Sequence, residues 1–160
     1  MHQAHREFAE YAVRCEAKFL EIQGEELDAL EAGIVRRFVR PDTRRGIWES
    51  LAYPFCYYRS DEHREVVSAL RLLVPERAHG RTVVWPDYPD AAAYCFSDIN
   101  QVGVVLSKLL WSEFLLTDAE LSFLLIYSDH GILYGLGDAL PLVDSVFGVE
   151  HVALVTGGEP

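Results

Sequence analysis

The clearest pattern of hydrophobic and polar positions runs from Trp111 to Gly137. Short apolar runs alternate there with turn residues, which predicts three antiparallel strands at 112–117, 121–127 and 132–136. The middle run is apolar on both faces, with Phe123 on one face and Leu124 and Ile126 on the other. A strand of this kind belongs in the middle of a sheet that is covered on both sides. We therefore predict that this meander forms the centre of the fold.

In the rest of the chain, apolar residues recur every three or four positions, which predicts helices. The predicted helices cover 8–22, 25–40, 61–74, 99–109 and 139–147, and further strands are predicted at 81–85, 93–96 and 149–155. Gly24 is expected to end the first helix, and Ser60, Asp98 and Asp138 are expected to cap later ones. Residues 41–59 show no clean period, and 55–58 fits either a strand or a packed loop.

These elements predict an α+β fold. N-terminal helices are expected to pack on a mostly antiparallel sheet of four to six strands that ends in the C-terminal three-stranded meander. A chain of 160 residues has the usual size of one domain. We predict a single domain over 1–156 and a frayed tail at 157–160.

Composition and charge narrow the classes of function. Half of the residues are hydrophobic, which argues against disorder, and the net charge is −11. Residues 60–160 hold five Lys or Arg and fifteen acids, whereas 33–59 hold six Arg and two acids. An acidic chain of this kind favours a basic protein partner and makes nucleic acid an unlikely one. No apolar run approaches the length that spans a membrane, so no membrane partner is expected.

The cysteines indicate a compartment. Cys15, Cys56 and Cys95 are an odd number, lie far apart and stand among apolar residues. Together with the charged N-terminus, which has no apolar secretion segment, they predict reduced core thiols in a cytoplasmic protein. No spacing typical of a metal site or of a phosphate-binding loop is present, so no metal and no cofactor is expected.

Two sets of residues are candidates for a site. Asp129, His130 and Glu113 are weak catalytic candidates, because a histidine beside a carboxylate suits general acid–base chemistry; a tight turn and an exposed strand end are the default explanation of these residues. The candidate binding residues are acids in turns and aromatic residues in the middle of the chain: Asp87, Asp90, Asp118 and Glu120, and Trp48, Tyr57 and Tyr58. The arginine cluster between Arg36 and Arg45 fits either binding of an acidic group or pairing with the protein's own acids.

The meander residues Glu113, Phe114, Asp129, His130 and Gly137 carry a resemblance. Over 111–137 the chain resembles small bacterial proteins of unknown function, some of them similar to immunity proteins of polymorphic toxin systems. What the resemblance implies is a role in binding, and thereby neutralising, a toxin without catalysis.

The leading hypothesis is therefore a non-enzymatic cytoplasmic protein-binding domain, immunity-type in its most specific form, that presents an acidic surface to a basic partner. A small enzyme with a pocket near Asp129 and His130 is the first alternative. A structural module that forms homo-oligomers is the second.

Overall fold

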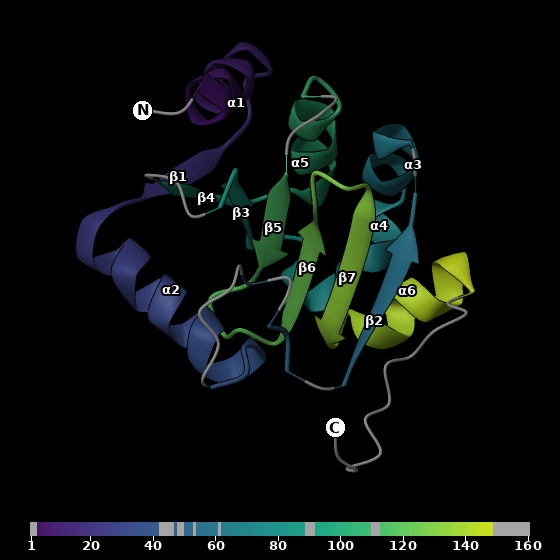
Figure 1. The fold of residues 1–160 in the computed structure, drawn as a ribbon. Helices are drawn as coiled ribbons and strands as arrows, with labels where there is room; N and C mark the ends of the chain where they lie inside the picture. The colour runs from purple at the N-terminus through teal and green to yellow at the C-terminus, as the bar shows by residue number, and fades with distance from the viewer. Residues whose placement is uncertain are drawn as a thin grey trace.

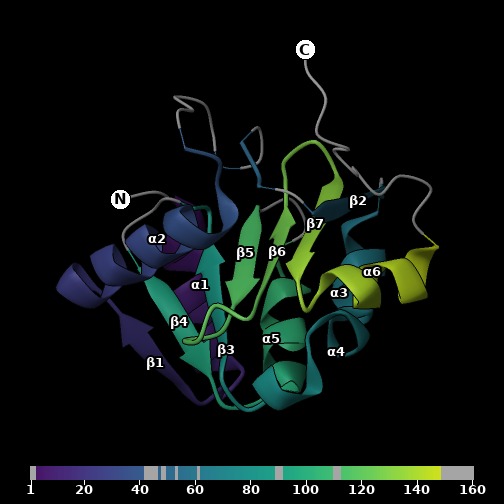
Figure 2. The ribbon, with the colours of Figure 1, turned by 90° about the horizontal axis from the view of Figure 1, so that it is seen from below.

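An antiparallel sheet separates two unequal layers of helices in the computed structural model (Figures 1 and 2). The structure describes residues 3–41, 47, 50–52, 54–60, 62–88, 92–109 and 113–148. The helices are α1 (Gln3–Arg14), α2 (Gly24–Phe38), α3 (His63–Ser68), α4 (Leu70–Leu73), α5 (Ile99–Leu106) and α6 (Leu140–Phe147), with a 3-10 turn, η2, at Glu76–Ala78. The strands are β1 (Phe19–Ile22), β2 (Phe55–Arg59), β3 (Thr82–Pro86), β4 (Ala93–Phe96), β5 (Phe114–Thr117), β6 (Phe123–Tyr127) and β7 (Ile132–Gly137). The α+β prediction is confirmed.

Within the described residues the sheet has seven strands in the order β1-β4-β3-β5-β6-β7-β2, and all neighbours are antiparallel. The predicted meander is its β5-β6-β7 part, with β6 inside the sheet. Phe123 and Leu125 of β6 pack into one core and Leu124 and Ile126 into the other, so the prediction of a strand covered on both faces is confirmed. Leu121 lies outside the strand, with a positive φ of 53°, and the prediction was wrong at that position.

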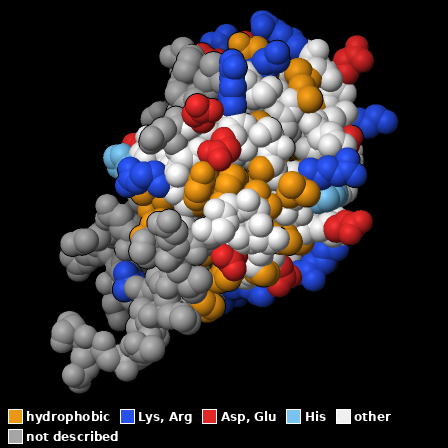
Figure 3. Space-filling model, turned by 90° about the vertical axis from the view of Figure 1, so that its right-hand side faces the viewer, with side chains coloured by type: hydrophobic (Ala, Val, Ile, Leu, Met, Phe, Trp, Pro, Cys, Tyr) orange, Lys and Arg blue, Asp and Glu red, His pale blue; other side chains and the backbone are white. Residues whose placement is uncertain are grey.

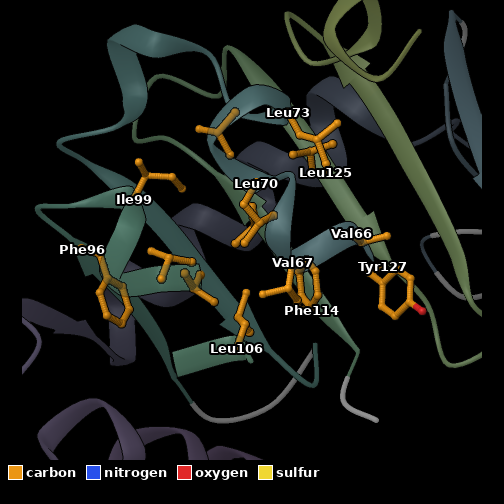
Figure 4. Packing of buried hydrophobic residues seen from close by; sticks show 14 of the residues in the cluster. Val66, Val67, Leu70, Leu73, Phe96, Ile99, Leu106, Phe114, Leu125 and Tyr127 are labelled. Atoms are coloured by element: carbon orange, nitrogen blue, oxygen red, sulfur yellow. The ribbon is translucent and has the colours of Figure 1, made fainter. Parts of the chain in front are cut away.

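The two cores lie on opposite faces of the sheet. Helices α1, α3, α4, α5 and α6 cover one face, where Phe114, Leu125 and Tyr127 are buried together with apolar residues of these helices (Figure 4). Helix α2 covers part of the other face and buries Ile34 and Phe38 against it. Successive side chains of a strand point to opposite faces, so each inner strand must be apolar throughout to supply both cores.

The predicted first helix was wrong beyond residue 14. The chain turns at Glu16, which has a φ of 53°, and 19–22 form the edge strand β1. Phe19 pairs with Phe96 across the sheet, and its ring lies 5.6 Å from that ring. The few apolar residues at 19–22 fit a short strand as well as a helix. Pairing with the distant strand β4 determines that these residues form a strand. Gly24 accordingly begins α2 and does not end α1.

Strand β1, together with β2 at 55–59, raises the count above the predicted four to six strands. The predicted helix over 61–74 is interrupted at Ala69, which separates α3 from α4. Asp98 caps α5 as predicted, because its carboxylate accepts a hydrogen bond from the Asn100 amide at 2.9 Å. Asp138 was wrongly predicted to cap α6; its carboxylate pairs with Arg77. The strand predicted at 149–155 lies outside the described residues.

All three cysteines are free, but only Cys56 is buried, whereas Cys15 and Cys95 are half-buried. Burial raises the pKa of the Cys56 thiol to about 11. None of the helices in the described part of the chain is both long enough and apolar enough to cross a bilayer.

Candidate functional site

In Figure 1 the start of β5 and the turn between β6 and β7 lie at the upper end of the sheet, and three acidic residues belong to this end. The register places the end of β3, the start of β5 and the end of β6 side by side. Asp87 follows β3, Glu113 precedes β5 and Asp129 lies in the turn after β6. We call these three residues the acidic cluster. The Asp87 amide donates to the Glu113 carbonyl at 3.0 Å, and the Asp129 amide donates to Glu113 Oε1 at 3.3 Å.

Glu113 is the electrostatic centre of this cluster. Its pKa is raised above the ordinary value, first by burial and then by the negative charge of Asp129, with a smaller contribution from Asp87. The backbone hydrogen bond from Asp129 acts in the opposite direction but is outweighed. In the described part of the chain, no Lys or Arg lies within 4.0 Å of these three carboxylates. Like charges held together without a cation disfavour ionisation and cost stability at neutral pH.

His130 lies beside the acidic cluster on the solvent side. Its Nε2 is 3.5 Å from Asp129 Oδ1, and its side chain is 74% exposed. The turn is closed by Gly131, whose φ of 69° is left-handed, and the Gly131 amide donates to the Ser128 carbonyl. The structure thus brings together the three predicted catalytic candidates. The His130 side chain is exposed to solvent, however, whereas general acid–base groups act best in an enclosed site.

Among the described residues, no three His, Cys, Asp or Glu side chains are placed so that they could hold a metal ion. The carboxylates of the acidic cluster are instead suited to accept hydrogen bonds from a cationic group. A Lys or Arg side chain would meet oxygens from three separate segments of the chain, and charge-assisted hydrogen bonds of this kind are the stronger ones.

The other predicted acids differ in their surroundings. Asp118 is fully buried, which contradicts its prediction as a solvated binding residue. Its carboxylate accepts hydrogen bonds from the Ser122 amide at 2.8 Å and the Ser122 hydroxyl at 2.5 Å, so it holds the β5–β6 turn. Glu120 is exposed but pairs with Arg81 at 2.8 Å. Asp90 lies outside the described residues.

Two of the three predicted aromatic candidates, Tyr57 and Tyr58, lie on the edge strand β2. Tyr58 stacks on Phe147 at 4.1 Å between ring centroids and donates a hydrogen bond to Glu65, which gives it a structural role. Tyr57 is half-buried and pairs with Tyr134 of β7 across the sheet. Trp48 lies outside the described residues.

The arginine cluster is described only in part. Arg36 and Arg37 are exposed in the last turn of α2, where cations favour the helix dipole. The Arg37 guanidinium lies 5.7 Å from the centre of the Phe38 ring. Arg44 and Arg45 lie outside the described residues, so the choice between binding and internal pairing stays a prediction.

Two features were missed by the sequence analysis. His63 is buried against Phe114 and Tyr127, and neither of its ring nitrogens has a hydrogen-bond partner in the part of the chain that the structure describes. Burial lowers its pKa. The second feature is a groove beside α5 whose cations Arg64 and Arg71 stand seven positions apart. The spacing of the two arginines could be read from the sequence, but the position of α5 on the other side of the groove could not.

Compared with known proteins, the chain matches no protein-family model, no curated protein and no solved structure.

Proposed function

We propose that the chain is a protein-binding domain that holds a basic partner at the acidic cluster. The observation that carries this proposal is the position of Glu113: half-buried, pressed against Asp129, near Asp87 and without a Lys or Arg within 4.0 Å in the described part of the chain. This arrangement costs free energy while the site is empty. A partner's Lys or Arg would restore the ordinary ionisation of Glu113 and recover that cost on binding.

The net charge of −11 adds a long-range contribution. Complementary charge steers two proteins together and raises the association rate, and the effect weakens once the screening length falls to ~10 Å near 0.1 M salt. Neutralisation of a basic toxin is the most specific form of the proposal, supported by the resemblance of residues 111–137 to immunity-type proteins.

Affinity capture with three versions of the protein tests this proposal. One column carries the wild type and the second carries Asp87→Asn, Glu113→Gln and Asp129→Asn. The third carries the matched control Glu25→Gln, Glu26→Gln and Asp28→Asn, which removes three exposed charges at the start of α2.

We expect basic proteins to be retained by the wild type and the control but not by the acidic-cluster variant. For a protein captured in this way, the association rate should fall as salt rises. Retention of the same proteins by all three columns, or an association rate that does not change with salt, would refute the proposal.

A small enzyme that uses Glu113 as a general acid is the second candidate, favoured by the raised pKa of Glu113 beside the Asp129–His130 pair. Turnover of any chromogenic ester or glycoside that is lost in Glu113→Gln and retained in Asp28→Asn would favour the enzyme. Equal turnover by both variants would exclude Glu113 as the acid.

A further inference from the structure

An open groove of about 680 Å³ separates α3 and α4 from α5 on the helical layer opposite α2. Val67 and Leu70 contribute its apolar floor, and Gly103 leaves room on the α5 side. Val104 forms part of the wall and is 48% exposed, so its apolar surface is open to a second molecule. The groove therefore offers apolar surface that a second molecule could cover.

Cations line this groove on both sides. Arg64 and Arg71 stand on α3 and α4, and Lys108 stands just after α5. No Asp or Glu of the described residues lines it, although the chain as a whole carries a net charge of −11. Figure 3 shows the side of the molecule that includes α3, on which Lys and Arg side chains alternate with Asp and Glu around exposed hydrophobic surface.

None of the three cations has a carboxylate within 4.0 Å in the part of the chain that the structure describes. Two acids close to the groove in the sequence are engaged elsewhere. Glu65 accepts hydrogen bonds from Ser60 and Tyr58, and Asp98 caps the start of α5. The positive charge of the groove is therefore available to a ligand.

We propose that this groove binds an acidic amphipathic helix of a partner protein. Such a helix lays its apolar face into a groove between two helices and places its charges along the rim. Its apolar side chains would cover Val104 and the floor, while its carboxylates would pair with Arg64, Arg71 and Lys108. This surface is chemically the opposite of the acidic cluster and goes beyond the binding of a basic partner there.

The spacing of the cations argues for an extended ligand. Arg64 and Arg71 stand on two separate helices, α3 and α4, and Lys108 stands on the α5 side of the groove. A single phosphate or carboxylate would meet only part of this lining, whereas an acidic amphipathic helix presents several carboxylates along its length. A nucleic acid would gain little from the apolar wall and would be repelled by the acidic remainder of the chain.

Titration of the ¹⁵N-labelled full chain with synthetic peptides tests the proposal. The first peptide is a 16-residue helix of Glu, Ala and Leu, with Leu at spacings of three and four. The second has Lys in place of every Glu, and the third probe is a single-stranded DNA 12-mer. The acidic peptide should shift amide signals of α3, α4 and α5, and the other two probes should leave these signals in place.

Two variants locate the binding. Arg64→Glu, Arg71→Glu and Lys108→Glu together should weaken acidic-peptide binding at least tenfold. The matched control, with Lys18→Glu, Arg36→Glu and Arg59→Glu, reverses three exposed cations elsewhere and should change binding less than twofold.

Gly103→Leu should block the groove without a change of charge, because the leucine side chain would occupy space on the α5 side. The backbone should accept it, since a Cβ at Gly103 meets only the Val67 carbonyl oxygen, at an ordinary 3.8 Å. Melting curves confirm that each variant is folded. No signal shifts at 1 mM acidic peptide, equal binding by the groove variants, or equal shifts with the Lys peptide or the DNA would each overturn the proposal.

Discussion

A methyl group added at Gly135 on β7 should overpack the core and destabilise the protein. A Cβ at this position would come within 2.7 Å of Val143 Cγ2 and 3.2 Å of Cys56 Sγ. Both neighbours are completely buried, so neither can move into solvent. Overpacking a dense core costs ~1–3 kcal/mol, and replacement of a strand glycine returns about 0.5–1 kcal/mol of chain entropy. From the middle of these two ranges, we expect Gly135→Ala to lower the free energy of unfolding by about 1 kcal/mol.

Gly103→Ala on α5 is the matched control. Its new methyl group contacts only the Val67 carbonyl oxygen, at 3.8 Å, and alanine is a better helix former than glycine by about 1 kcal/mol. The same substitution should thus stabilise the protein in α5 and destabilise it in β7. Urea denaturation followed by circular dichroism measures both changes as shifts of the midpoint.

A double-mutant cycle isolates the contact between α6 and β7. Val143→Ala removes the Cγ2 atom that the new methyl group would meet, so Gly135→Ala should cost much less in that background. The reasoning is refuted if Gly135→Ala has the same cost in both backgrounds, or if it leaves the midpoint of the wild type unchanged.

Further predictions concern buried and titrating side chains. Phe123→Ala should cost ~3–5 kcal/mol in urea denaturation. Since the pKa of Glu113 is raised, Glu113→Gln should be more stable than wild type at pH 7 but not at pH 3.5, as compared by thermal melting. Since the pKa of His63 is lowered, wild type should lose stability relative to His63→Leu as pH falls below about 6.5. Cys56, with its pKa near 11, should react with a thiol reagent only after unfolding.

The strands with a clear local hydrophobic pattern could be predicted from the sequence. β6 was predicted because both of its faces are apolar, and β5 and β7 because a turn separates each of them from it. β1 was missed because Phe19 and Ile22 fit the helical period that precedes them equally well. Its partner on β4 lies more than seventy positions later, and no local pattern reports that contact.

The acidic cluster was predictable to the same extent. Glu113 and Asp129 flank two strands of one predicted meander, so their meeting followed from a hairpin. Asp87 was predicted as a separate turn acid, because the placement of β3 beside β5 depends on the whole sheet. Asp118 was predicted to be solvated, but the turn folds its carboxylate back onto Ser122, where two hydrogen bonds hold it in the interior.

The acidic cluster and the groove present opposite charges on one small domain, and this limits what salt dependence can show. Added salt weakens both kinds of contact, because screening acts on attraction of either sign. Substitutions distinguish the two surfaces. Neutralising Glu113 should weaken the binding of a basic partner alone, whereas reversing the charges of Arg64 and Arg71 should weaken the binding of an acidic partner alone. A partner whose binding is weakened by both sets of substitutions must carry a basic and an acidic segment. A partner that responds to one set identifies which of the two surfaces it binds.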